Sequence, residues 1–194
     1  MQRESKIKRK TKETDIHLSL SLDGQGVSNI DTGIGFFDHM LSTFCLHGGF
    51  DIELECKGDL NVDCHHNIED VGIVLGKAFS ESLGDKKGIR RYGMYTIPMD
   101  EALATCNLDI SNRPYLVFNA SFTSPKIGDM DAQMVKEFFN AFAVNAGITL
   151  HLNLVYGSND HHIAEALFKA FGYALKQGVE RSEKGETLST KGCL

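Results

Sequence analysis

Three features are absent from this sequence, and each absence argues against a class of protein. The five cysteines are odd in number and show no CxxC spacing, which argues against a disulfide framework or a thiolate zinc site and favours a reducing cytoplasm. No apolar run approaches the roughly 18 residues of a membrane-spanning helix, and no apolar stretch of a secretory signal follows the basic N-terminal residues. Neither GxGxxG after a strand nor GxxxxGK[ST] occurs, so a nucleotide cofactor has no support.

The remaining composition is that of a globular protein with an acidic balance. The 194 residues are 42% hydrophobic and 24% charged, which suits one domain or two small fused halves with a substantial core. The formal net charge of −6 argues against a general nucleic-acid binder. In the basic segment KIKRKTKE, charged residues alternate with Ile7 and Thr11, a pattern typical of an edge strand. We therefore expect neither a nucleic-acid nor a membrane partner.

A pair of histidines followed by a glutamate occurs twice. Residues 64–70 read CHHNIED and residues 160–166 read DHHIAEA, and the offset between the copies is 96 at all three positions. On a helix, His65 and Glu69 share one face, whereas His66 lies about 100° around the axis. A single copy would be typical of a solvated helix start, but two copies in one register indicate an internal duplication of a metal-binding motif.

Apolar periodicity predicts the same order of elements in both halves. The first half is expected to have strands at about 5–12, 16–22, 27–30 and 50–56, with helices from Phe37 to Gly48 and over 65–83. The second is expected to have strands at about 92–97, 103–110, 115–120 and 149–155, with helices over 132–146 and 160–177. Each half is β-β-β-α-β-α, and regular βαβ alternation is missing. We predict an α+β fold, a two-layer α/β sandwich made of two duplicated halves.

The histidine count suggests two similar metal sites. His39 lies roughly 200° from the apolar stripe of its helix, and His151 shares the polar face of its strand with Asn153. Together with the two motifs they make six histidines and two glutamates, or three imidazoles and one carboxylate for each of two ions. This set favours Mn²⁺, although the spacing also accommodates zinc, iron or cobalt. His17 and His47 do not fit the set, because the first lies on a polar strand face and the second ends a helix.

Several stretches together resemble one family over essentially the whole length. FFDHML, DCHHNIEDVGI, RRYG, PMDEAL, NRPYLVF, DHHIAEALFKAF and the late STKG are similar to the imidazoleglycerol-phosphate dehydratases of histidine biosynthesis. The resemblance implies a metal-dependent dehydration of D-erythro-imidazole glycerol phosphate to imidazole-acetol phosphate plus water. It further implies a duplicated fold like ribosomal protein S5 domain 2, a cytoplasmic 24-subunit shell, and two Mn²⁺ per active site formed between subunits.

The resemblance also implies roles for individual residues. The metal ligands would be His39, His65, His66, Glu69, His151, His161, His162 and Glu165. The phosphate clamp would be Arg91, Arg113, Ser189 and Lys191, in keeping with the match between guanidinium forks and phosphate oxygens. Glu13 matches the catalytic acid/base glutamate, which also contacts substrate, and Glu101 opens the equivalent strand of the second half. The expected organisation is a first repeat over 1–90, a second over 91–180, and a phosphate-binding tail over 181–194.

Two other functions use the same ligands. A metal-dependent hydrolase would activate a water molecule and make two products from one ester or amide. A metal-storage or metal-stapled shell protein would bind ions without turnover, and it would give no role to Arg91, Arg113 and Lys191.

Overall fold

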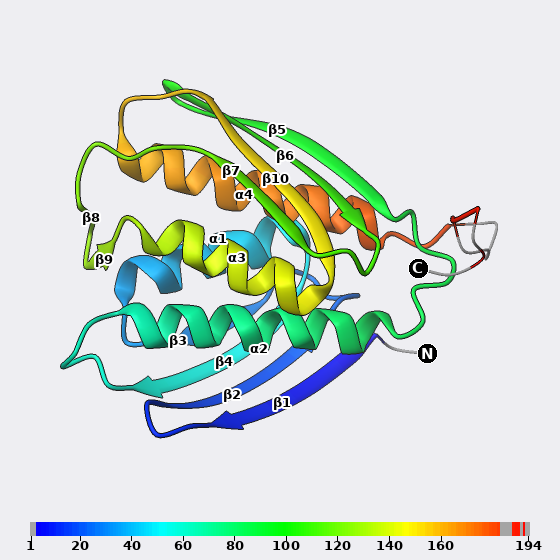
Figure 1. Cartoon of the computed structure of the whole chain (residues 1–194), viewed down its shortest axis with the longest axis horizontal. Coiled ribbons are helices and arrows are strands. Elements are labelled where there is room, and N and C mark those ends of the chain that lie inside the picture. Colours follow the sequence, from blue (N-terminus) through cyan, green and yellow to red (C-terminus); the bar gives the residue numbers. More distant parts are fainter. Residues whose placement is uncertain (1–2, 183–187, 191, 193–194) are drawn as a thin grey trace.

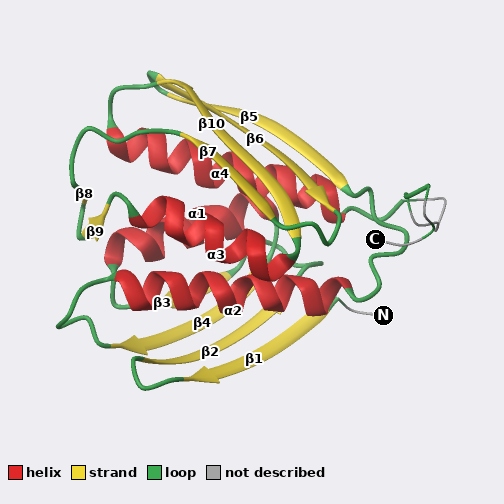
Figure 2. Cartoon of the chain, in the orientation of Figure 1, coloured by secondary structure: helices red, strands yellow, loops and turns green. Residues whose placement is uncertain are grey.

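The computed structural model describes residues 3–182, 188–190 and 192, and it consists of four layers (Figure 1). Two four-stranded sheets form the outer layers, and the helices lie between them (Figure 2). The helices are α1 (Gly35–Gly48), α2 (His65–Leu83), α3 (Met134–Ala146) and α4 (Asp160–Val179). The predicted α+β class, with helices on one face of each sheet, is confirmed. None of these helices is long and apolar enough to cross a membrane.

The first sheet has the strand order β1-β2-β4-β3. Its strands are β1 (Glu4–Lys10), β2 (Thr14–Ser21), β4 (Asp51–Gly58) and β3 (Ser28–Asp31), with β3 parallel to β4 and the other neighbours antiparallel. The lysine-rich segment forms an edge strand, as predicted. Along β2, Ile16, Leu18 and Leu20 are buried against the helices, and the residues between them face outward.

The second sheet repeats this order as β5-β6-β10-β7. Its strands are β5 (Tyr92–Met99), β6 (Ala102–Ile110), β10 (Ile148–Tyr156) and β7 (Tyr115–Asn119). An additional hairpin, β8 (Lys126–Ile127) and β9 (Met130–Asp131), precedes α3 and departs from the predicted β-β-β-α-β-α order. Strands of two residues are too short to have an alternation that could be detected in the sequence.

This hairpin stabilises the start of a helix in the other half. α1 begins after Ile34, which offers no side-chain cap. Asp129, at the hairpin turn, accepts hydrogen bonds from the backbone N–H groups of Gly35 (2.7 Å) and Phe36 (2.9 Å). The carboxylate thereby satisfies donors that would otherwise be unpaired and complements the helix dipole.

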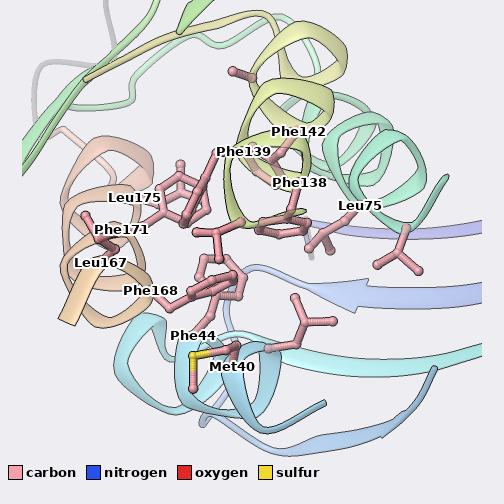
Figure 3. Packing of buried hydrophobic residues seen from close by; sticks show 14 of the residues in the cluster. Met40, Phe44, Leu75, Phe138, Phe139, Phe142, Leu167, Phe168, Phe171 and Leu175 are labelled. Atoms are coloured by element: carbon pink, nitrogen blue, oxygen red, sulfur yellow. The ribbon is translucent and has the colours of Figure 1, made fainter. Parts of the chain in front are cut away.

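The core is a cluster of aromatic and aliphatic side chains between the two sheets (Figure 3). Phe44 of α1 stacks on Phe171 of α4, with ring centroids 5.1 Å apart, and Phe138 of α3 stacks on Phe168 of α4 at 5.3 Å. All four side chains are fully buried. Helices from both halves therefore share one core, which fixes the orientation of the halves relative to each other.

Both α2 and α4 begin at the left end of the molecule in Figure 1, and the ends of the described chain lie at the right. The histidine pairs are at the start of these two helices. The segment that leads into β5 begins where α2 ends, at the opposite end of the molecule from the histidine pairs.

Two glycines at equivalent positions of the duplication bring the helix pairs into close contact. A Cβ added to Gly76 of α2 would lie 2.6 Å from the carbonyl oxygen of Phe142 in α3. A Cβ added to Gly172 of α4 would lie 2.8 Å from the carbonyl oxygen of Phe44 in α1. Real Cβ atoms do not approach backbone so closely, so only glycine permits these spacings.

We predict that Gly76→Ala destabilises the protein by about 1–3 kcal/mol. Alanine favours helix by about 1 kcal/mol, but the clash with a backbone oxygen forces α2 and α3 apart and outweighs this gain. Urea unfolding at a fixed protein concentration measures the change. Lys77→Ala, on the exposed face of the same helix, is the control and should change the stability by less than about 0.5 kcal/mol. A Gly76→Ala protein as stable as the wild type would show that the helix spacing is adjustable.

Candidate metal and phosphate sites

Three of the predicted metal ligands converge at the start of α4. The ligand atoms of His39, His161 and Glu165 lie within 4.8 Å of one another. Glu165 Oε2 is 3.2 Å from Nε2 of His161 and 3.5 Å from Nε2 of His39. Glu165 is only 8% exposed, whereas both imidazoles face solvent. Two ring nitrogens and one carboxylate oxygen thus point to a common position at the surface.

Local structure explains why these side chains meet. The Asn159 side chain caps α4 and accepts hydrogen bonds from the backbone N–H groups of His161 (2.9 Å) and His162 (3.4 Å). Glu165 follows His161 by four residues and therefore lies on the same helix face. α1, which carries His39, packs against α4.

Lys169 extends this face by another turn, and our sequence analysis did not select it. Its Nζ lies 2.7 Å from Glu165 Oε1, so the two oxygens of Glu165 have different partners. Burial is the largest single influence and raises the pKa of Glu165, but the hydrogen bond and charge of Lys169, together with His39 and His161, leave the pKa below its ordinary value. The i, i+4 spacing from Glu165 was the available signal for Lys169.

The first copy of the motif forms only a pair within the described residues. His65 Nε2 lies 3.5 Å from Glu69 Oε2, and both side chains are about half exposed. Asp63 accepts a hydrogen bond from the backbone N–H of His65 at 2.8 Å and so caps the start of α2. In both copies the first histidine thus lies beside its own glutamate on one helix face, but among the described residues a third ligand joins only the second copy.

The second histidine of each motif has a carboxylate partner on its Nδ1 atom. His66 Nδ1 lies 3.0 Å from Asp59 Oδ1, and His162 Nδ1 lies 2.7 Å from Glu101 Oε2. The hydrogen bond to Asp59 raises the pKa of His66. The hydrogen bond from His162 is the main cause that lowers the pKa of Glu101 to about 2.

Glu13 lies immediately before β2, close to His66. Its Oε1 atom is 3.8 Å from His66 Nε2, which is beyond hydrogen-bond distance, and its side chain is 54% exposed. The carboxylate is therefore accessible to a ligand. Glu101 occupies the corresponding position before β6.

His151 lies on the outer face of the second sheet. It pairs with Asn107 of β6 and is half-buried there, as the alternation along its strand predicted. Asp109 is two residues from Asn107 along β6 on the same face, so it is a diagonal neighbour of His151 at about 7–8 Å. His151 is therefore close to Asp109 rather than to the metal-ligand cluster of its own chain.

Three of the four predicted phosphate-binding residues gather at the opposite end of the molecule. Asp109 joins two of them: its carboxylate accepts from Arg91 at 2.6 and 3.0 Å and from Arg113 at 3.1 Å. Arg91 also donates to the carbonyl oxygen of Leu188, which precedes Ser189. Lys191 lies outside the described residues. Asp109 was missed by the sequence analysis, although it precedes Arg113 by four residues.

The length of α4 separates this arginine group from the metal-ligand cluster. The backbone N–H of Arg91 donates to the carbonyl oxygen of Gly178 at 2.9 Å. His161 and Gly178 are seventeen residues apart in one helix, a rise of roughly 25 Å. One chain therefore presents its imidazole cluster and its guanidinium groups at two distant places.

Comparison with known proteins gives a consistent result. A family model described as imidazoleglycerol-phosphate dehydratase matches residues 32–175. Imidazoleglycerol-phosphate dehydratases from Acetivibrio thermocellus and Phenylobacterium zucineum are 56% and 55% identical, and each alignment covers 100% of both chains.

Two solved structures of proteins with the same name have this fold. The crystal structure of the Staphylococcus aureus enzyme superposes with a TM-score of 0.84 at 44% identity, covering 92% of this chain and 99% of that one. The Pyrococcus furiosus enzyme, solved in complex with (S)-C348, superposes with a TM-score of 0.85 at 37% identity, covering 97% and 100%.

We predict that His39→Ala weakens Mn²⁺ binding strongly, because it removes a ligand atom from the converging group. The loss should exceed the roughly 10–100-fold that follows when a partner outside the metal's own ligands is removed. Calorimetric titration with MnCl₂ at fixed pH measures the affinity. His47→Ala is the control: it changes a histidine of the same helix that packs against Tyr173 instead. Equal affinities for the two variants would remove His39 from the site.

Proposed function

The chain belongs to the imidazoleglycerol-phosphate dehydratase family, and from this membership we propose that it converts D-erythro-imidazole glycerol phosphate to imidazole-acetol phosphate plus water. It is thus a hydro-lyase of histidine biosynthesis. We further propose that the reaction depends on two Mn²⁺ ions per active site and takes place in the cytoplasm. The observation that best supports this function is the convergence of His39, His161 and Glu165 on one position.

The donor atoms in this cluster suit a divalent ion of intermediate hardness. Neighbouring ligands of an octahedral ion with bonds of about 2.1 Å are about 3 Å apart, close to the 3.2 and 3.5 Å between Glu165 Oε2 and the two Nε2 atoms. The other proposed ligands are His65, His66, Glu69, His151 and His162. Bound divalent ions would supply the positive charge that stabilises the substrate imidazole as an anion.

Proton transfer is the task we assign to Glu13. A hydroxyl leaves from the carbon attached to the ring and a proton leaves from the next carbon. The resulting enol becomes the ketone by taking up a proton at the first carbon and releasing the proton of its own O–H group. The balance is the loss of one water molecule. Glu13 is exposed beside His66, and its carboxylate oxygen has no hydrogen bond from a described residue that would need to be broken first.

The phosphate of the substrate suits the arginine group. Arg91, Arg113 and Ser189, together with Lys191, would provide two guanidinium forks, a hydroxyl and an ammonium. Asp109 holds the first two side chains in place while leaving Arg113 exposed. In the proposed division into repeats over 1–90 and 91–180 and a phosphate-binding tail over 181–194, Arg91 and Arg113 belong to the second repeat and the tail adds Ser189 and Lys191.

The separation of roughly 25 Å supports an active site shared between chains. An imidazole ring with a three-carbon phosphate chain is far too short to contact His161 and Arg113 of the same chain. We therefore propose that a neighbouring copy supplies one of the two groups. The 24-subunit shell is the assembly we propose, with its active sites at contacts between subunits.

The two rival functions leave particular residues unexplained. A hydrolase would use the same ions, but it would not require a base placed beside a carbon–hydrogen bond, as we assign to Glu13. A storage protein would not require the arginine group at all. The hydrolase and the storage protein each predict a different outcome from ours when the protein is incubated with imidazole glycerol phosphate.

We predict that the Mn²⁺-loaded protein, incubated with imidazole glycerol phosphate, yields a product lighter by one water molecule in mass analysis. Chelator-treated protein should give none until Mn²⁺ is returned. Release of inorganic phosphate instead would identify a hydrolase. Unchanged substrate with fully loaded protein would favour metal storage.

We also predict that His161→Ala and Arg113→Ala are each inactive alone, but that assemblies containing both chains regain part of the activity. A mixed assembly contains sites at which an intact histidine group of one chain meets an intact arginine group of another. Co-expression with two affinity tags isolates such assemblies for rate measurements. Mixed assemblies that remain inactive would indicate that each chain completes its own site.

A further inference from the structure

The second histidines of the two motifs have the same arrangement. The rings of His65 and His66 are 6.2 Å apart at 71°, and those of His161 and His162 are 6.2 Å apart at 82°. In both pairs the second imidazole directs Nδ1 to a carboxylate, while Nε2 lies 3.8 Å from the nearest carboxylate oxygen. An imidazole that donates its Nδ1 proton keeps the lone pair on Nε2.

The carboxylates that accept these protons are not equivalent in the duplication. Asp59 lies in the loop between β4 and α2, whereas Glu101 lies in the turn between β5 and β6. Glu13, not Asp59, is the counterpart of Glu101, since each of the two glutamates immediately precedes the second strand of its sheet. The same task is thus performed by residues from different segments.

A difference in loop length accounts for this exchange. The glycines that end α1 and α3, Gly49 and Gly147, are offset by 98 residues, whereas His65 and His161 are offset by 96. The loop of the second half is therefore two residues shorter, with GSND at 157–160 in place of DLNVDC at 59–64. It contains no acidic residue at the place of Asp59.

Glu101 is fixed by several donors at once. Its Oε1 accepts from the backbone N–H groups of Ser158 (3.2 Å) and Asn159 (2.7 Å), and its Oε2 accepts from His162. Such a carboxylate is held in one orientation and would have to lose hydrogen bonds before it could accept another proton. Glu13 has no comparable set of partners among the described residues, because Asp59 already binds His66.

We propose that Asp59 and Glu101 are positioning residues that hold His66 and His162 in the tautomer with a free Nε2, and that this arrangement leaves Glu13 alone of the two equivalent glutamates available for proton transfer. The inference rests on the proposed metal-dependent function. It assigns different tasks to the two copies of one glutamate. Carboxylates that hold metal-binding imidazoles in this way typically affect metal affinity by 10–100-fold.

Amide variants separate this role from a structural one. In Glu101→Gln the single oxygen is retained by Ser158 and Asn159, so the loop keeps its hydrogen bonds and the NH₂ group faces His162 Nδ1. An NH₂ donor there favours the opposite tautomer, in which Nε2 carries the proton and cannot bind a metal ion. Both oxygens of Asp59 face His66, at 3.0 and 3.2 Å, so Asp59→Asn can still present its one oxygen to Nδ1.

The test is Mn²⁺ affinity without substrate, measured from the electron paramagnetic resonance signal of the unbound ion. We expect Glu101→Gln and Asp59→Ala to weaken binding by about 10–100-fold, and Asp59→Asn to bind within about threefold of the wild type. Asp63→Ala is the control, since among the described residues the hydrogen bond of Asp63 comes from the backbone N–H of His65 rather than from an imidazole. Glu13→Gln should bind Mn²⁺ normally and lose turnover.

Wild-type affinity in Glu101→Gln, or an equal loss in Asp63→Ala and Asp59→Ala, would overturn the inference. Gel filtration and thermal unfolding of each variant identify any loss that comes from misfolding, which Glu101→Gln should not show. Failure of the proposed function has a different result, because the wild-type protein would then bind no Mn²⁺ or would not dehydrate its substrate.

Discussion

The close packing of α1 against α4 is the constraint on which the candidate metal site depends. Gly172 lets the two helix backbones approach, and the stacked rings of Phe44 and Phe171 lie in the same contact. Glu165 is two helical turns before Gly172 on α4, and His39 is on the facing helix. The spacing of the helices therefore decides whether imidazole and carboxylate can contact the same ion. The aromatic core and the ligand geometry are two consequences of one packing arrangement.

Much of the fold follows from local patterns in the sequence. Alternation identified the principal strands, and helical periodicity identified the helices, because each element buries one face against the shared core. The 96-residue offset revealed the repeated histidine motif. The same offset relates Gly76 to Gly172, and in the structure both glycines lie against the backbone of a neighbouring helix. The β8–β9 hairpin could not be predicted, since each strand has two residues and its function is a distant contact from Asp129 to α1.

The candidate site was predictable in its residue types but not in its arrangement. His39, His161 and Glu165 meet because two helices pack together, which no spacing along the chain encodes. The partners of the predicted ligands were harder to find: Lys169, which binds Glu165, lies one helical turn further on, and Asp59, which binds His66, lies in a loop without periodicity. The placement of His151 on the polar face of its strand was correct. Its separation from the metal-ligand cluster of its own chain is explained by the proposal that ligands from two chains form each site.

Divergence after duplication connects these observations. The second histidine of each motif binds a carboxylate from a different segment, Asp59 in the β4–α2 loop and Glu101 in the β5–β6 turn. We propose that the metal-ligand cluster and the arginine group of one chain belong to different active sites. We propose that His39, His161 and Glu165 bind a common divalent ion. The most direct test is an anomalous difference map from Mn²⁺-soaked crystals, recorded at the manganese edge. We expect a peak between the two Nε2 atoms and Glu165 Oε2. A well-occupied manganese peak elsewhere, with none at this position, would contradict this proposal.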